Sequence, residues 1–232
     1  MRSRWLLFLF LCARIAVAQP LVIDRPAQGF IPNQGQWPKE VLAQLPTETA
    51  RIWIMEKGFR FTLRGPEEVD SADLFVFSET FEGAARGQFV GSLPLAGSLT
   101  FYSPLGYSAA VPQFAEGAVH GLYPGVTLEL SLSPDGFLKT NWVGERAQDL
   151  ARVASTFEGL PSGTPSGGNH ITFDLPVGNL TISLPQAGNV RKALHAHWEE
   201  EQGQWHPKAK GATWIDPVYR FSTFSGSISD NF

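Results

Sequence analysis

Four segments alternate between apolar and polar side chains, and this pattern constrains the fold more than any other feature of the sequence. The segments are 58–64, 126–132, 171–175 and 180–184. In "GFRFTLR" (58–64), for example, Phe59, Phe61 and Leu63 fall on one face of an extended chain. One apolar face per strand is typical of antiparallel sheets packed on a core. We therefore predict an all-β protein.

The remaining chain agrees with this prediction. Further strands are predicted at 51–55, 74–77, 99–102, 137–143, 194–199 and 214–221, and clusters of Gly, Pro and Ser, such as 160–169, predict loops. Helical signals are confined to one possible turn at 37–42 and a short connector at 145–154. The expected fold is an antiparallel β-sandwich or a strongly curved pair of sheets with one short helix.

Residues 1–18 have the pattern of a secretory signal peptide. Arg2 and Arg4 precede an apolar run at 5–11, and the sequence Ala-Val-Ala at 16–18 is a small-x-small cleavage site. The run is too short to cross a bilayer. We predict that the protein is secreted or lies on the outer cell surface, with no membrane span once the signal is cleaved.

Charge and cysteine content exclude several functions for the cleaved chain. Three of the 18 basic residues lie in 1–18, so 15 basic residues remain against 22 acidic ones, a net charge of −7. This balance disfavours binding to nucleic acid. The only cysteine, Cys12, also lies in 1–18. The cleaved chain therefore has no thiol nucleophile, thiolate metal site or internal disulfide.

Several stretches, in order, resemble an uncharacterised N-terminal domain of large secreted bacterial proteins. They are "FIPNQGQWPKEV" (30–41), "GLYPGVTLEL" (121–130), "DGFLKTNWVG" (135–144), "STFEGL" (155–160) and "WIDPVYRFSTFSGSISDN" (214–231). The sequence departs from the family pattern at Thr127, where an Asp is usual, and at 140–142. The resemblance implies no catalytic residues.

In proteins of this kind, the last of these stretches leads into SBBP-type β-propeller repeats, and many members end in a gliding-motility-type (type IX) sorting domain. The resemblance thus implies a signal peptide at 1–18, the all-β domain at 19–220, and the start of a downstream propeller repeat at 221–232. It implies a non-catalytic module that caps or presents that propeller. We expect the chain after Arg220 to be mobile in the absence of those repeats, with Phe221 and Phe224 exposed.

No catalytic motif or cofactor motif was found, so we expect neither an enzyme nor a cofactor. One hairpin gathers candidate metal ligands. If residues 202–203 form its turn, Glu199 lies opposite His206, and His195 and His197 share their face. These groups suit zinc. A solvated hairpin without bound metal is the simpler interpretation, and we expect no stoichiometric metal.

Aromatic residues raise the alternative of a carbohydrate-binding module or a carbohydrate-active enzyme, with cell-surface polysaccharide or protein as partner. The candidates for a flat sugar platform are Trp37, Trp142, Trp198, Trp205 and Trp214. Most large aromatic side chains of a domain without disulfides are expected to fill its core. An exposed Trp row, or two acids facing across a cleft, would favour this alternative.

The signal peptide generates the first testable prediction. When the chain is expressed in a bacterial cell, the exported product should begin at Gln19, as intact-mass analysis can show. Leu9→Arg should block export because it breaks the apolar run, whereas Ser3→Ala should not. An exported product that retains residues 1–18 would contradict the prediction.

Overall fold

The computed structural model describes residues 28–65, 74–146, 148–161, 163–166, 170–183, 187–189, 192–194, 197–201, 204–208, 214–215 and 217–222. The side chains of most of the segments after residue 183 are not part of this description. The predicted signal peptide and residues 223–232 lie outside the described residues. No helix in the described part is long and apolar enough to cross a membrane.

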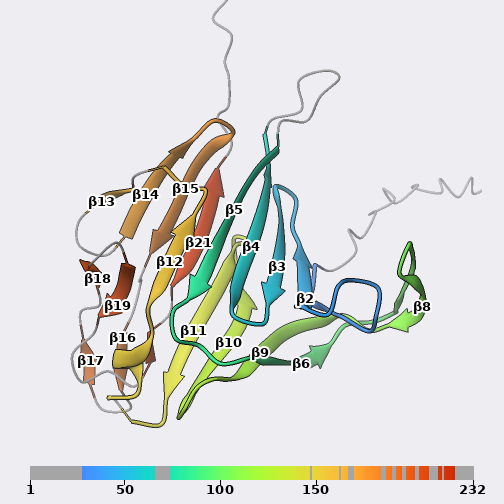
Figure 1. The fold of residues 1–232 in the computed structure, drawn as a ribbon, viewed down its shortest axis with the longest axis horizontal. Coiled ribbons are helices and arrows are strands. Elements are labelled where there is room, and N and C mark those ends of the chain that lie inside the picture. The colour runs from blue at the N-terminus through green and yellow to red at the C-terminus, as the bar shows by residue number, and fades with distance from the viewer. Residues whose placement is uncertain are drawn as a thin grey trace, which may run out of the picture.

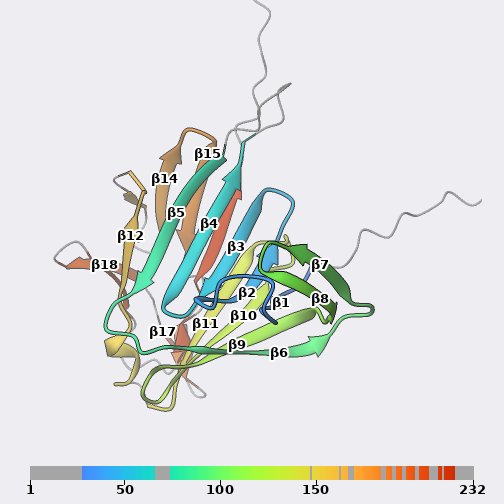
Figure 2. The same ribbon diagram turned by 45° about the vertical axis from the view of Figure 1, so that its right-hand side comes forward.

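Two antiparallel sheets form the body of the protein, and Figures 1 and 2 show them as two facing layers. The first sheet has the order β1 (Ile31–Pro32), β2 (Val41–Pro46), β3 (Ala50–Met55), β4 (Gly58–Arg64), β5 (Leu74–Phe81), β12 (Ser155–Glu158), β19 (Gln204–Lys208) and β18 (His197–Glu201). This confirms the predicted all-β class.

The second sheet has the order β13 (Thr164–Ser166), β14 (His170–Leu175), β15 (Gly178–Ser183), β21 (Val218–Ser222), β11 (Leu138–Gly144), β10 (Val126–Leu132), β9 (Phe114–Tyr123) and β6 (Gln88–Pro94). Three short strands, β16 (Ala187–Asn189), β17 (Lys192–Leu194) and β20 (Trp214–Ile215), join it beside β11. A separate hairpin of β7 (Leu99–Ser103) and β8 (Gly106–Val111) leaves the body between β6 and β9 and lies to the right in Figure 2.

The alternating segments place their apolar faces between the two sheets, as predicted. Phe59, Phe61 and Leu63 of β4 are buried, and Arg60 and Arg64 are exposed. Burying a side chain of this size contributes roughly 1.5–3 kcal/mol to stability. Aromatic rings from both sheets meet in this layer. Phe61 stacks on Phe77 of its own sheet, with ring centroids 4.4 Å apart, and on Tyr219 of the other sheet at 5.5 Å.

The two helical signals have different outcomes. Residues 37–42 form no helix, because the chain turns at 39–40 and Val41 already begins strand β2, whose apolar side chains reach the core. The connector at 145–154 contains one short 3₁₀-helix, η1 (Leu150–Arg152), which buries Leu150. The single short helix of the prediction is therefore found in the predicted connector.

Two predicted strands are each divided in two. The segment 214–221 is interrupted at Pro217, between β20 and β21, because proline has no N–H group to donate to a neighbouring strand. Its carbonyl oxygen instead accepts a hydrogen bond from the Thr140 backbone N–H at 2.9 Å. The segment 194–199 includes the end of β17 and the start of β18, which belong to different sheets, and residues 195–196 lie outside the described residues.

The expectation that Phe221 is exposed is wrong. Phe221 is only 5% exposed, belongs to the core, and pairs with Leu180 of β15. Strand β21 ends at Ser222, two residues beyond the predicted domain boundary at Arg220. Neighbours within this domain, β15 on one side and β11 on the other, supply the pairing that a downstream repeat was expected to supply.

Candidate functional site

A buried glutamate lies on the apolar face of β5. Alternation along this strand turns Phe77, Glu79 and Phe81 toward the second sheet, and Glu79 is 2% exposed. Acidic side chains are rarely buried unless they are hydrogen-bonded or uncharged. Glu79 was not among the candidate residues predicted from the sequence, because the strand predicted at 74–77 ended before it. Its position two residues from a phenylalanine on either side is the signal that places it on the inner face.

Tyr219 provides the main hydrogen bond to this glutamate. Its hydroxyl donates to Oε2 of Glu79 at 2.8 Å, and the bond joins β5 of the first sheet to β21 of the second. The Tyr219 ring is held edge-on by Phe59 at 6.0 Å, besides its stacking on Phe61. Ser155 of β12 also hydrogen-bonds the Glu79 carboxyl. The carboxyl group thus sits in a polar cluster enclosed by aromatic rings.

Burial decides the protonation of this cluster. It raises the pKa of Glu79 from an ordinary 4.5 to about 7, although the hydrogen bonds from Ser155 and Tyr219 oppose the rise. Burial, followed by the charge of Glu79, holds the pKa of Tyr219 well above its usual value. Near pH 7, the Glu79 carboxyl group is therefore protonated in part of the molecules, and Tyr219 keeps the proton that it donates.

A second tyrosine supports the same region. The Tyr123 hydroxyl donates to the carbonyl oxygen of Glu82 at 2.8 Å, which ties β9 to the chain just after β5. Burial raises the pKa of Tyr123 to about 12. Gly58 is also required here, because a Cβ atom at this position would collide with the carbonyl oxygen of Glu79. Glycine thus allows β4 and β5 to approach each other closely beside the buried carboxyl.

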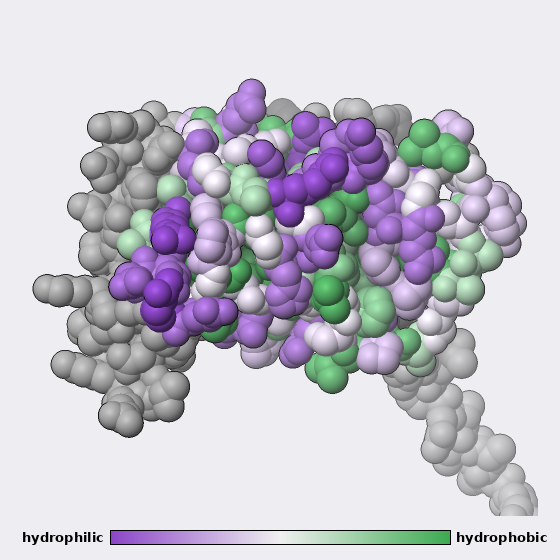
Figure 3. All heavy atoms as spheres, turned by 60° about the horizontal axis from the view of Figure 1, so that its bottom comes forward, coloured by the Kyte–Doolittle hydropathy of each residue, from purple (hydrophilic) through white to green (hydrophobic). Residues whose placement is uncertain are grey.

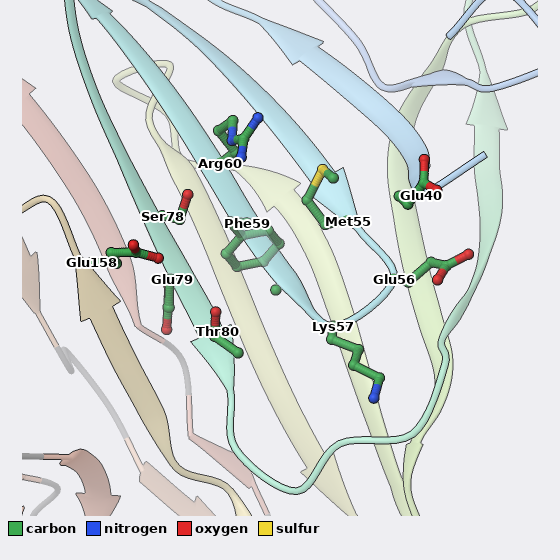
Figure 4. Close-up of a pocket in the computed structure, with 11 residues that line it drawn as sticks. Glu40, Met55, Glu56, Lys57, Phe59, Arg60, Ser78, Glu79, Thr80 and Glu158 are labelled. Atoms are coloured by element: carbon green, nitrogen blue, oxygen red, sulfur yellow. The ribbon is translucent and has the colours of Figure 1, made fainter. Parts of the chain in front are cut away.

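A hollow of about 320 Å³ lies on the outside of the first sheet, beside the turn between β3 and β4. Figure 4 shows Glu56 and Glu40 at one side of it and Glu158 at the other, with Phe59 and Ser78 between them. Glu56 forms an ion pair with Arg86 at 2.6 Å. Glycoside hydrolysis requires two carboxylates that flank one bond. Glu56 and Glu158 lie on opposite sides of the hollow in Figure 4, and the ion pair with Arg86 engages the first of these two carboxylates.

The candidate metal ligands lie in the part of the chain where side chains are not described. The backbone register confirms the predicted hairpin, since Glu199 pairs with His206, while His197 pairs with Lys208. His195 lies outside the described residues. Among described residues, no group of three His, Cys, Asp or Glu side chains could hold a metal ion. Whether the hairpin binds metal stays a prediction.

Of the tryptophans named as candidates for a sugar platform, the two whose side chains are described do not form an exposed row. Trp142 is buried in the core and packs edge-on against Phe81 with centroids 4.9 Å apart. Trp37 is half-buried and contacts Trp53 at 5.3 Å and Phe101 at 5.4 Å. The side chains of Trp198, Trp205 and Trp214 are not described. At Thr127, where the family pattern has Asp, the hydroxyl lies 3.5 Å from Nδ1 of His120.

Comparison with known proteins gives one match. A family model described as "Domain of unknown function (DUF7948)" covers residues 30–192. This finding confirms the part of the resemblance that predicted an uncharacterised domain. No curated protein and no solved structure matches the chain.

The raised pKa of Glu79 predicts how stability depends on pH. Because the folded pKa is above the unfolded one, the stabilisation is complete below pH 4.5 and is lost as the pH rises through 7. The free energy of unfolding of the wild type, relative to Glu79→Gln, should therefore fall by about 2 to 3 kcal/mol between pH 5 and 8.

Urea denaturation of both proteins across this pH range measures the difference. Glu158→Gln, at an exposed site on the neighbouring strand β12, is the matched control and should show no such dependence. A difference between wild type and Glu79→Gln that stays constant with pH would contradict the assignment.

Proposed function

We propose that this chain, which belongs to the DUF7948 domain family, is a non-catalytic module of an exported protein. In this proposal, the module holds the domains that follow it. The residues of the sequence resemblance support SBBP-type β-propeller repeats as those domains. The signal-peptide pattern of residues 1–18 supports a secreted or cell-surface location.

The position of β21 carries this proposal. The strand lies inside the second sheet, with Ile182 of β15 opposite Tyr219 on one side and Leu138 of β11 opposite it on the other. A terminal strand at a sheet edge can peel away one residue at a time. β21 pairs with β15 over Val218–Ser222 and with β11 at Val218 and Tyr219, so two ladders must break before the start of the strand is released. This makes β21 a firm attachment for whatever is joined after it.

The Glu79 cluster strengthens this attachment. Tyr219 connects β21 to the opposite sheet, and Phe221 buries its ring two residues later. Thr140 of β11 is fully buried and donates its hydroxyl to the carbonyl oxygen of Pro217 at 3.3 Å, just before the strand begins. The strand is thus held at its start, at its middle and near its end.

Close packing between the two sheets, in the part of the chain that the structure describes, supports a non-catalytic role. The described hollow at the edge of the two sheets, lined by Leu63, Leu138 and Phe221 among others, has a volume of about 20 Å³, which is room for roughly one water molecule. Glu79, whose pKa of about 7 would suit a general acid or base, is sealed away from solvent. Glu79 is also among the residues that line the outer hollow of the first sheet, where only 2% of its surface is exposed.

Pulling on β21 tests the proposed attachment. In a chain with Cys12→Ser, handles on Glu145→Cys and Phe232→Cys would load β21 along its length against β11. We expect β21 to stay bound until the domain unfolds in one cooperative event, because two ladders and the Tyr219 bond must break together. Tyr219→Phe should lower the unfolding force, since it removes the hydroxyl that binds Glu79.

Leu74→Ala, which changes an exposed side chain on β5, is the control and should leave the force unchanged. Release of β21 alone at low force, before the rest of the domain unfolds, would contradict the proposal.

A further inference from the structure

A long uncharged stretch surrounds the β7–β8 hairpin. Residues 87–115, between Arg86 and Glu116, are 29 consecutive positions without Asp, Glu, Lys or Arg. They comprise β6, the hairpin and the first residues of β9. Figure 3 shows pale purple, white and green atoms at the right-hand end of the molecule, the side of β8 in Figure 1, whereas the deepest purple lies over the middle and left.

Two tyrosines project from the outer face of this hairpin. Tyr102 and Tyr107 are opposite each other in the register, with ring centroids 5.0 Å apart and ring planes at 43°. Tyr102 is 83% exposed and Tyr107 is 62% exposed. Burying such rings is a main source of stability in β domains. Neither ring is buried in the core, so the stability of the core does not explain why the two rings lie together on the surface.

The opposite face of the hairpin attaches it to the body. Phe101, next to Tyr102, contacts the edge of Trp37, and Trp37 in turn contacts Trp53 of β3. These edge-to-face contacts fix the hairpin on the first sheet. The tyrosine pair is therefore presented on a supported surface.

The backbone at the base of the hairpin is strained. Among described residues, the non-glycine positions with a left-handed backbone are Leu93, with φ 54°, and Ala110, with φ 55°. Leu93 lies in β6, and Ala110 lies in β8 where the register with β7 shifts by one residue. Each costs roughly 1–2 kcal/mol relative to an ordinary conformation. Strain of this kind is concentrated at functional sites.

We propose that the Tyr102–Tyr107 pair is a binding surface for neutral polysaccharide. The rings offer apolar faces on which the C–H faces of sugar rings can stack, and tyrosine loses little conformational entropy when it binds. Thr100, which is exposed and lies two residues before Tyr102 on β7, can hydrogen-bond sugar hydroxyl groups. The uncharged surroundings provide no attraction for a polyanion, and the net negative charge of the chain repels one. This binding goes beyond the proposed attachment role and uses a different part of the fold.

Electrophoresis of the full chain through gels that contain amylose, hydroxyethylcellulose or mannan tests the proposal, with alginate as the acidic polymer. At least one neutral polymer should retard the wild type, and alginate should not. Tyr102→Ala with Tyr107→Ala should weaken retardation on the order of tenfold, the combined loss of two aromatic contacts.

Tyr102→Phe with Tyr107→Phe keeps both ring faces and should preserve binding. Leu74→Ala removes an exposed apolar side chain elsewhere and is the matched control. All of these side chains are exposed, so the midpoint of thermal unfolding should be the same in every variant. If the double alanine variant does not fold, the single variant Tyr107→Ala takes its place in the retardation test.

Three results would overturn the proposal: no retardation by any neutral polymer, equal retardation of the double alanine variant, or binding only to alginate. A further result would overturn it as well: if the protein sedimented with phosphatidylcholine vesicles and no neutral polymer retarded it, a lipid surface would be the partner.

Discussion

The hydrogen bond from Tyr219 to Glu79 joins the two sheets at the centre of their aromatic layer, and the arrangement around it depends on that bond. A carboxyl group buried among phenylalanines is costly unless it has partners or stays neutral. The fold supplies both conditions, since Ser155 and Tyr219 bind the carboxyl group and burial raises its pKa to about 7. The same bond draws the last described strand into the core. A feature of β5 thereby fixes β21, 140 positions further along the chain.

Alternation was sufficient to predict the strands that face the core on one side. Segments 58–64 and 126–132 have the predicted bounds as β4 and β10. It was insufficient for Phe221, because the sequence alone does not show that β15 and β11 leave a place between them for β21. Glu79 was missed for a related reason: an acidic residue ended the apolar pattern, although its hydrogen-bond partner lies far away in sequence. Residues 37–42 do not form the predicted helical turn, because Val41 already belongs to β2, whose apolar side chains are buried in the core.

The two proposed roles belong to separate regions of the molecule. The attachment of β21 depends on buried contacts. The alternation of apolar and polar residues that indicates the other strands also indicates β21 in the sequence. The tyrosine pair rests on exposure, which depends on how Phe101 and Trp37 place the hairpin on the first sheet. Exposure is a property of the assembled structure. The sequence therefore offered tryptophans as candidates for a sugar platform, although most were expected in the core, whereas the structure exposes Tyr102 and Tyr107.

Native-state hydrogen exchange of the full chain tests most directly whether β21 is a locked strand of this domain. If Tyr219 and the two flanking strands hold it, the amides in Val218–Ser222 that bond to β15 or β11 should exchange only through global unfolding. Their free energies of exchange should then equal those of the slowest amides in β4 and β11. Exchange of the β21 amides through local opening, at free energies well below those of β4, would contradict the central role given to this strand.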